Sequence, residues 1–435
     1  MPSRVGPAPP PRTGTLHGVT DLPDPPDPRL PLRTRLASGV SRTAAALSRA
    51  TGRGDGSVIG GRIGLLIDPD LLAHLAVGRQ IALVSGTNGK TTTTRLTAAA
   101  LGVLGPVATN SLGANMPSGH TSALARAGRT PYAVLEVDEH YLAQVLAATR
   151  PAVVALLNLS RDQLDRAMEV AMMAARWRAA LAGHPAVHVV ANADDPMVVW
   201  AAGAAGAVTW FSAGQRWHDD SWVCPQCGSA IIRDRDQWAC SGCPLRRPRP
   251  DWVAADRAVV GPDRTRYEVK LALPGRVNLG NAATALAVAA RFGAAPADAA
   301  GRLGEVSSVA GRYAQVERDG RRIRLLLAKN PASWLEAFDM AEPAPTLLAV
   351  NARGPDGLDT SWLFDVDFSP LAGRPVLITG DRAFDLAVRL QVNRLPFTHV
   401  TGFAAAVAAV PPGRLEVIAN YTAFQDIRAE LDRVL

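Results

Sequence analysis

The stretch "GTNGKTTTT" at positions 86–94 constrains the fold of this chain more than any other feature. It follows an apolar run at 81–84, which is typical of a buried parallel strand, and it precedes an Ala- and Leu-rich stretch with helical spacing. A strand, a Gly-rich turn, a Lys-Thr pair and a helix are the context of a phosphate-binding P-loop, although this loop is shorter than the usual G-x-x-x-x-G-K-[ST] pattern. We therefore expect an α/β fold with a parallel sheet and a nucleotide site.

The loop residues suggest individual roles. Gly86 and Gly89 let the backbone approach phosphate oxygens closely, and the free N–H groups at the start of the helix face an anion. Lys90 can neutralise the β- and γ-phosphates, and the hydroxyl of Thr91 can bind Mg²⁺. Only three of the 46 basic residues are lysines, so a lysine at this position indicates a need for a compact charge. The expected nucleotide-binding residues here are Gly86, Thr87, Asn88, Gly89, Lys90, Thr91 and Thr92.

The formal net charge of +7 is concentrated at the N-terminus. Residues 1–53 hold eight Arg and three Asp, and ten prolines come before residue 32. We expect a disordered Pro/Arg-rich tail at 1–55, with a role at an anionic membrane surface left open. The nearly neutral remainder argues against a nucleic-acid surface. No apolar run reaches the roughly 18 residues of a membrane span and no signal peptide is visible, so we expect a cytoplasmic protein, peripheral at most at the inner membrane surface.

The four cysteines lie together in "CPQCGSAIIRDRDQWACSGC". Two C-x-x-C pairs at this spacing predict a tetrahedral Zn²⁺ site of the zinc-ribbon type. The segments "SAIIR" and "QWAC" are expected to form two short strands that hold the pairs together. A closed site with four thiolates is structural by default, and helix and strand patterns resume on both sides, which indicates an insertion. The expected zinc ligands are Cys224, Cys227, Cys240 and Cys243.

Six further segments follow the loop in an order that resembles the central ATPase domain of the Mur ligases and folylpolyglutamate synthases. Each segment is weak evidence alone, whereas six in the same order are specific. They are "LEVDEH" (135–140), "NLSRDQLDR" (158–166), "ANADDP" (191–196), "LPGRVNLGNAATALAVA" (273–289), "AGRYAQVE" (310–317) and "LAKNPAS" (327–333).

This resemblance implies ligand roles for particular residues. It implies that Glu136 binds Mg²⁺, with Glu139 as the alternative. Gln163 stands where the family has a metal-binding His, and the Asp of the segment at 327–333 is absent. The resemblance implies four further nucleotide-binding residues, Asn278, Asn281, Arg312 and Lys329.

The chain resembles the MurT branch of this family in three features. They are the Cys₄ insertion, the absence of a UDP-binding domain before the loop, and the segment "GPDGLDTSWLFDVDF" (354–368). The implied fold is a Mur-ligase-type P-loop ATPase domain at 56–305, with the ribbon inserted at about 213–255. A smaller α/β C-terminal domain would follow at 306–435.

The implied activity is ATP-dependent amidation of the D-glutamate α-carboxylate of lipid II to D-isoglutamine through an acyl-phosphate, in peptidoglycan biosynthesis. A GatD-type glutaminase would supply the ammonia, because this chain has no candidate nucleophilic Cys outside the ribbon. In the family an Asp of the C-terminal domain is thought to complete the partner's triad. Asp356, Asp359 and Asp365 are candidates, and we favour Asp359 because it directly precedes "TSW"; turn and helix-cap roles are the alternative. The expected catalytic residues are Asp359, Lys90 and Asp356.

Two other functions remain open from the sequence. One is an amino-acid-adding ligase of the folylpolyglutamate synthase type. The other is a P-loop NTPase that binds nucleic acid through its ribbon, for which "CPLRRPRPD" (243–251) is the only local support. The lack of interleaved basic and aromatic stretches elsewhere counts against the second.

Overall fold

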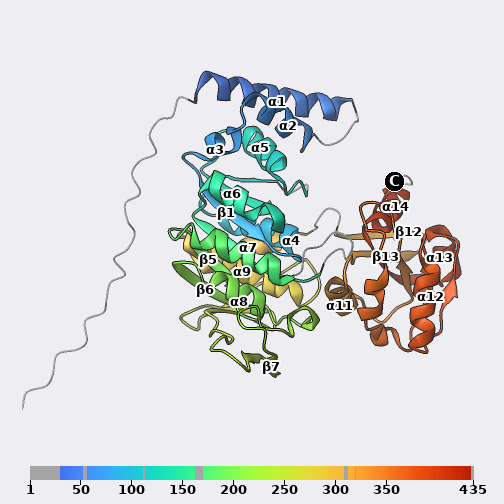
Figure 1. Cartoon of the computed structure of the whole chain (residues 1–435). Coiled ribbons are helices and arrows are strands. Elements are labelled where there is room, and N and C mark those ends of the chain that lie inside the picture. The colour runs from blue at the N-terminus through green and yellow to red at the C-terminus, as the bar shows by residue number, and fades with distance from the viewer. Residues whose placement is uncertain are drawn as a thin grey trace, which may run out of the picture.

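The structure is a computed structural model that describes residues 30–51, 56–110, 113–161, 170–307, 312–318 and 320–432. It contains two α/β units, each built on its own sheet, with three N-terminal helices at one end of the first unit (Figure 1). The last helical turn of the first unit ends at Glu305 and the second sheet begins at Tyr313. The boundary that we propose near residue 306 falls between them.

Within the described residues, the first unit holds a nine-stranded sheet of order β11-β10-β9-β6-β5-β4-β1-β3-β2. Its strands pair in parallel from β2 to β9, and β10 and β11 add an antiparallel edge. Strand β1 lies between β3 and β4, so the strand order reverses there, and ligands of such sheets bind beyond the carboxyl ends of the strands at this point. The strands are β1 (Gln80–Ser85), β2 (Val107–Thr109), β3 (Tyr132–Val137), β4 (Val153–Leu156), β5 (His188–Asn192), β6 (Ala207–Ser212), β9 (Trp252–Ala255), β10 (Ala258–Val260) and β11 (Arg266–Glu268).

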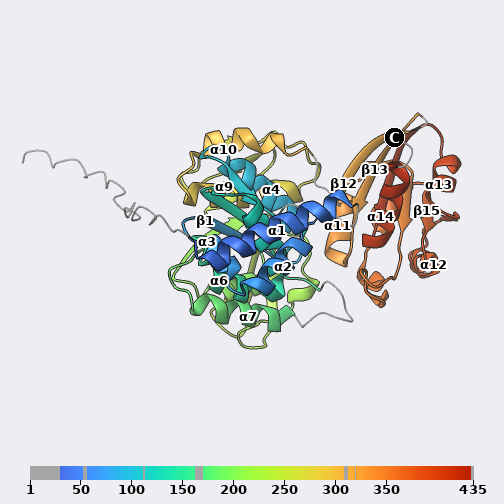
Figure 2. The same cartoon turned by 90° about the horizontal axis from the view of Figure 1, so that it is seen from above.

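Both faces of this sheet are covered, as the continuous apolar strands predict (Figure 2). In β1, Ile81 and Leu83 point to one core while Ala82 and Val84 point to the other. One face carries α4 (Lys90–Leu101), α9 (Val277–Arg291) and α10 (Pro296–Arg302), which leads into η3 (Leu303–Glu305). The other face carries α5 (Pro117–Arg126), η1 (Glu139–Tyr141), α6 (Leu142–Thr149), α7 (Val170–Ala182) and α8 (Pro196–Ala202).

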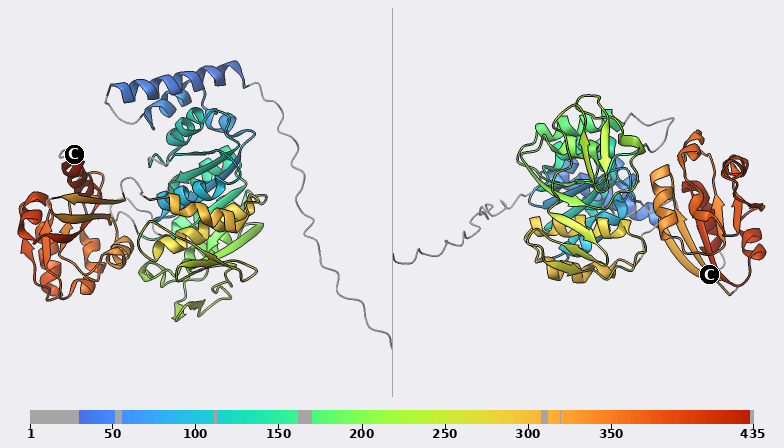
Figure 3. Two further views of the ribbon diagram at one scale, coloured as in Figure 1. Left: turned by 180° about the vertical axis from the view of Figure 1, so that it is seen from behind. Right: turned by 90° about the horizontal axis from the view of Figure 1, so that it is seen from below.

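The cysteine-containing segment is an excursion from this sheet. Strands β6 and β9 are paired in parallel, so the chain leaves the sheet after Ser212 and returns to it at Trp252. Between them lie η2 (Asp219–Ser221) and the antiparallel pair β7 (Ile231–Asp234) and β8 (Gln237–Cys240), which confirms the two predicted strands. This hairpin lies at the opposite end of the unit from the N-terminal helices (Figure 3, left).

The N-terminal helices correct one expectation. Helix α1 (Leu32–Ala50) lies inside the stretch predicted to be disordered, so that prediction is wrong for these residues. The prolines that suggested disorder end at Pro31, and small buried residues of α1 pack on the glycine-rich α2 (Ile59–Ile67). Helix α3 (Leu71–Ala76) then leads to β1. Residues 1–29 of the predicted tail lie outside the described residues.

The second unit holds, within the described ranges, a six-stranded sheet of order β12-β13-β17-β14-β15-β16, which is parallel except for the β12–β13 pair. Helices α11 (Pro331–Met340) and α12 (Ala383–Val392) cover one face, and α13 (Phe403–Ala409) and α14 (Tyr421–Asp432) cover the other. Two short turns, η4 (Ser361–Asp365) and η5 (Ser369–Leu371), follow β14. The strands are β12 (Tyr313–Arg318), β13 (Arg321–Leu327), β14 (Thr346–Ala349), β15 (Val376–Thr379), β16 (Thr398–His399) and β17 (Gly413–Ala419).

The architecture confirms the expected fold class of two α/β units with parallel sheets. Among the helices of the described residues, none is both long and apolar enough to cross a bilayer.

Candidate active site

The P-loop connects β1 to α4 at the reversal point of the first sheet. Gly89 caps α4 with φ +84°, in the left-handed region that favours glycine. A Cβ on Gly86, where φ is +148°, would come within 2.8 Å of the Cβ of Leu157. Both glycines are therefore required by the fold of the loop.

Lys90 lies folded over this loop. Its Nζ donates hydrogen bonds to the carbonyl oxygen of Gly86 at 2.6 Å and to Oε2 of Glu139 at 2.8 Å. The side chains of Lys90 and Glu139 are only 4% and 10% exposed, so the pair is largely removed from water. The structure thus places the predicted lysine at the loop and gives it a carboxylate partner.

A residue of the neighbouring strand end holds the loop in shape. Asn158, just after β4, accepts a hydrogen bond from the N–H of Asn88 at 2.8 Å and returns one to its carbonyl oxygen at 3.1 Å. The backbone carbonyl of Asn158 also accepts from the N–H of Thr87 at 2.9 Å. Asn158 opens the quoted segment at 158–166, but its role in fixing the loop was not predicted.

The carboxylate of Glu136 is the better candidate for a metal ligand. Glu136 is the penultimate residue of β3, beside the loop. It is buried, and its Oε2 makes no hydrogen bond within the part of the chain that the structure describes. Its backbone is fixed by Asn110, which accepts from its N–H at 2.8 Å, and by His120, whose Nε2 lies 2.7 Å from its carbonyl oxygen. Burial lowers the pKa of His120 to about 4, so this histidine is neutral and donates at that nitrogen.

These side chains have the chemistry that a hard divalent cation requires. Mg²⁺ takes oxygen ligands, and an unpartnered carboxylate oxygen at the end of β3 beside the loop is such a ligand. Thr91, in the first turn of α4, offers a hydroxyl. Because Glu139 is already paired with Lys90, the geometry favours Glu136 over Glu139. Gln163, the other position considered for metal, lies outside the described residues.

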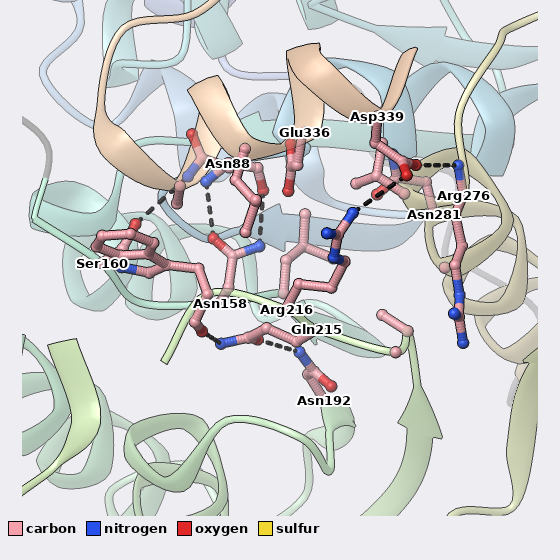
Figure 4. A pocket seen from close by; sticks show the side chains of 18 of the residues that line it. Asn88, Asn158, Ser160, Asn192, Gln215, Arg216, Arg276, Asn281, Glu336 and Asp339 are labelled. Carbon is pink, nitrogen blue, oxygen red and sulfur yellow. Dashed lines mark hydrogen bonds and ion pairs between the residues drawn. The ribbon is translucent and has the colours of Figure 1, made fainter. Parts of the chain in front are cut away.

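A cleft lies between the two units, beyond the loop (Figure 4). The amides of Asn88 and Asn330 meet across it at 3.3 Å. Arg216 pairs with Asp339 of α11 at 3.1 Å, and the backbone N–H of Arg276 donates to the same carboxylate at 3.3 Å. The first unit contributes the loop and the strand ends, and the second contributes α11.

An adjoining cleft of about 600 Å³ brings together most of the predicted nucleotide-binding residues. Within it, the side chain of Asn281 accepts from Thr93 and donates to Asn278, both at 3.0 Å, so the two asparagines of the "NLGN" segment are mutually oriented. Lys329 precedes α11, and its N–H donates to Ser333 Oγ at 2.9 Å; it does not line this cleft. The predicted residues that line the cleft are Asn88, Gly89, Thr92, Asn278, Asn281 and Arg312.

Glu336 is the cleft residue that the sequence reasoning missed. It lies on α11, is partly buried, and lines both clefts. Burial raises the pKa of its carboxyl to about 7; Arg312 opposes this shift and Asp339 adds to it. The only available signal was a glutamate among the mainly apolar residues of "PASWLEAFDM".

The four cysteines converge as predicted, with all four Sγ atoms within 4.8 Å of one another. Cys224 and Cys243 are 3.7 Å apart, and Cys227 and Cys240 are 3.4 Å apart. Tetrahedral zinc with Zn–S bonds of about 2.3 Å requires sulfur atoms separated by about 3.8 Å, so this donor set suits Zn²⁺.

The hairpin is docked on the first unit by Trp238. Its ring packs in a small core with Val199, Cys224 and Ile231, and its Nε1 donates to the carbonyl oxygen of Ala193 at 3.0 Å. The Cys₄ hairpin therefore packs against the first unit and is not a free-standing finger.

The three aspartates considered for a partner differ in their surroundings. Asp356 accepts from the N–H of Thr422 at 2.9 Å and also from its hydroxyl, so it braces the start of α14. Asp365 pairs with Arg161 of the first unit at 3.1 Å. Asp359 is exposed and accepts local hydrogen bonds from Ser361, whose N–H donates at 2.8 Å, and these bonds lower the pKa of its carboxyl. The geometry favours Asp359 and speaks against the expected catalytic role of Asp356.

Comparison with known proteins shows which families the chain matches. Residues 84–289 match the Mur ligase middle domain, and residues 327–424 match the MurT ligase C-terminal domain. The chain is 29% identical over 401 residues to the lipid II isoglutaminyl synthase (glutamine-hydrolyzing) subunit MurT of Streptococcus pneumoniae, covering 85% of this chain and 89% of that protein. It is 27% identical over 434 residues to the MurT subunit of Staphylococcus aureus strain COL, covering 92% and 98%.

Solved structures show the same fold. A pseudomurein peptide ligase type C from Methanothermus fervidus superposes with a TM-score of 0.64 at 17% identity, covering 82% of this chain and 79% of that one. MurF from Acinetobacter baumannii superposes with a TM-score of 0.62 at 16% identity, covering 85% and 80%. With the two matched domains in this order and MurT relatives along nearly the whole length, the chain belongs to the MurT branch of the Mur ligase family.

Proposed function

We propose that this chain is the synthetase subunit of a glutamine-dependent ligase that amidates the D-glutamate α-carboxylate of lipid II in peptidoglycan synthesis. The observation that carries the proposal is the cleft in which a P-loop from one unit meets α11 of the MurT-type unit. The S. pneumoniae and S. aureus relatives, named lipid II isoglutaminyl synthase (glutamine-hydrolyzing), indicate the substrate and the glutamine dependence.

The reaction requires activation of a carboxylate, because its oxygen is a poor leaving group. The carboxylate oxygen attacks the γ-phosphorus of ATP, ADP leaves, and an acyl-phosphate forms. Ammonia then attacks the carbonyl carbon, the C–O bond to phosphate breaks, and the amide and inorganic phosphate are released. Positioning and charge stabilisation are the protein's main contributions to phosphoryl transfer.

Lys90 and the loop N–H groups would hold the β- and γ-phosphates. For Lys90 to reach them, its ammonium must turn from the carbonyl oxygen of Gly86 while staying near the loop. Thr91 and Glu136 would hold Mg²⁺, which neutralises charge that develops on the transferred phosphoryl group. Asn281 and Arg312 line the part of the cleft where the nucleoside would lie.

A second subunit would supply the ammonia. All four thiols of the chain form the Cys₄ group, so glutamine hydrolysis by a Cys–His pair belongs to a partner of the GatD type. Asp359 is exposed on the C-terminal unit and would orient the partner's histidine as the third member of a triad.

An apolar surface surrounds this aspartate, and we call it the docking face. Leu358 directly precedes Asp359, and Thr360 binds Asp385 of α12 at 2.8 Å, so the loop and α12 form one surface. Large exposed apolar patches on a soluble domain mark interaction sites. The exposed apolar side chains of the docking face are Leu358, Phe364, Phe384, Val388 and Val392.

The test is reconstitution with the glutaminase. The purified pair, lipid II, ATP, Mg²⁺ and glutamine should give amidated lipid II by mass spectrometry, and the chain alone should give it only with ammonium. Addition of an amino acid to the substrate instead of ammonia would show a ligase of the folylpolyglutamate synthase type. ATP turnover stimulated by DNA or RNA but not by lipid II would show a nucleic-acid-dependent NTPase.

A further inference from the structure

Helix α1 has an apolar stripe on the side that faces away from the molecule. The side that packs on α2, α3 and α5 is made of small buried residues, Thr34, Ala37, Ser41 and Ala45. The opposite side carries leucines that are 80% (Leu32), 61% (Leu36) and 63% (Leu47) exposed. At 100° per residue these three leucines fall within one narrow sector of the helix.

Arginines flank this stripe. Arg35, Arg42 and Arg49 recur every seven residues, so they lie along one side of the stripe, and Arg33 lies on the other. All four arginines are exposed, and the helix contains no Asp or Glu. We call the three leucines and four arginines together the α1 face.

Helix α2, next to α1, also exposes apolar and basic side chains. Helix α2 packs against α1 and exposes Leu66 at 82%, together with Ile59 and Arg62. Figure 1 shows α1 as the outermost element at its end of the molecule, and in the described ranges no element lies over the α1 face. The docking face on α12 lies on the other unit from α1 in both Figure 1 and Figure 2.

We propose that the α1 face lies in the interface of an anionic membrane leaflet, with its leucines in the headgroup and acyl boundary and its arginines on the lipid phosphates. A helix with an apolar stripe and a cationic, acid-free flank has the composition of an in-plane membrane helix. Anionic lipids complement its charge, since juxtamembrane arginines are attracted to an anionic leaflet.

This inference rests on the proposed function for its purpose. A lipid-linked substrate is confined to the bilayer, so an enzyme held at the same surface meets it at a raised effective concentration. One short helix without a lipid anchor gives reversible binding, which allows the complex to dissociate after reaction.

Vesicle co-sedimentation of the full chain tests the proposal. The wild type should bind vesicles of phosphatidylcholine with phosphatidylglycerol, bind phosphatidylcholine alone weakly, and be released by high salt. Leu36→Glu/Leu47→Glu should weaken binding by about tenfold or more, and Arg35→Gln/Arg42→Gln/Arg49→Gln should do the same and also reduce the salt dependence.

Matched controls lie away from α1. Met172→Glu places the same charge on an exposed apolar position of α7, and Arg249→Gln/Arg257→Gln/Arg264→Gln removes three exposed arginines elsewhere. Both controls should bind vesicles like the wild type. Circular dichroism checks that every variant is folded.

Two results would overturn the membrane proposal. One is wild-type chain that stays in the supernatant with anionic vesicles, or leucine variants that sediment like wild type. The other is a leucine variant that changes the oligomeric mass or glutaminase binding with no change in vesicle binding, which would make the α1 face a protein interface.

Amidation of a water-soluble, short-chain lipid II analogue should be unchanged in the α1 variants. If wild type fails on that substrate, the proposed function is wrong, while the vesicle result still decides the role of α1.

Discussion

Lys90 Nζ and Glu139 Oε2 lie 2.8 Å apart at the mouth of the P-loop, in a pair that is almost closed to water. Such a pair holds the ammonium beside the loop before nucleotide arrives, and a buried charge without a partner would be costly. The phosphates of ATP would enter as additional acceptors for the same ammonium. Lys90 is therefore preorganised, and its effect on rate should be large.

Lys90→Ala should lower amidation by about 10²–10³-fold, because a positioned cation at the developing charge has been removed. Thr91→Ala should have a similar effect through loss of the Mg²⁺ ligand. Lys270→Ala, at an exposed lysine, is the control and should keep full activity. Both loop variants should still co-purify with the glutaminase, and full ligation by either variant would mean that ATP binds elsewhere.

Glu136→Gln should raise the Mg²⁺ concentration needed for half-maximal ATP turnover by about tenfold or more, since an amide is a weaker ligand for a hard cation. Glu139→Gln should leave this Mg²⁺ requirement nearly unchanged and instead weaken ATP binding, because its partner is Lys90. The two Mg²⁺ titrations compare the two carboxylates directly. A reversed pattern would exchange their roles.

The purified chain should contain about one zinc per molecule, as a closed four-thiolate set requires. Cys227→Ser should lower the zinc content and the melting temperature, because metal binding contributes to folding. Asp234→Asn, at an exposed position of β7 in the same hairpin, is the control and should change neither quantity. Chain prepared without chelator that holds no zinc in elemental analysis would refute this site.

Asp359→Asn should lower glutamine-dependent amidation by about 10²–10⁴-fold, as loss of the orienting carboxylate does in a triad. Ammonium salt at mildly alkaline pH should restore activity, because the ATP site is untouched. Asp367→Asn is a matched control, since Asp367 accepts from the N–H of Ser369 at 2.9 Å in the same local arrangement. Failure of Asp359→Asn with both nitrogen sources would place Asp359 in the ligase site or the fold.

The free energy of unfolding of the chain should depend on pH partly through Glu336. Its folded pKa of about 7 lies above the ordinary value, so the folded state holds the proton more tightly than the unfolded state. The tighter binding of this proton stabilises the folded state. The stabilisation is fully present below about pH 4.5 and is lost as pH rises through about 7.

Glu336→Gln should therefore flatten the pH dependence of unfolding relative to wild type between about pH 4.5 and 7, by an amount on the order of 1–3 kcal/mol. Urea unfolding at several pH values measures it. Glu317→Gln, at an exposed strand position, should follow the wild-type curve. Superimposable curves for wild type and Glu336→Gln would mean that this carboxyl titrates normally.

Several features were predictable because their causes are local. The loop at 86–94 requires glycines at fixed positions and a lysine at the helix start, and these residues can be read directly from the sequence. The two C-x-x-C pairs predict a four-thiolate site for the same reason, since a short hairpin brings them together whatever surrounds it. The parallel core strand at 81–84 was equally evident from its unbroken apolar run.

Other features depended on contacts between distant segments, which a single sequence does not display. Composition suggested disorder through residue 55, but α1 folds because its small residues fit the glycines of α2. Asp356 and Asp359 look equivalent in the sequence. In the structure, Thr422 of α14 donates a hydrogen bond to Asp356, whereas Asp359 stays exposed. Glu336 and Asn158 acquired roles when separate segments closed around one cleft, because burial and hydrogen-bond partners are set by tertiary structure. The chemical groups of this protein can be read from its residues, whereas packing between distant segments occupies some of its carboxylates and leaves others available.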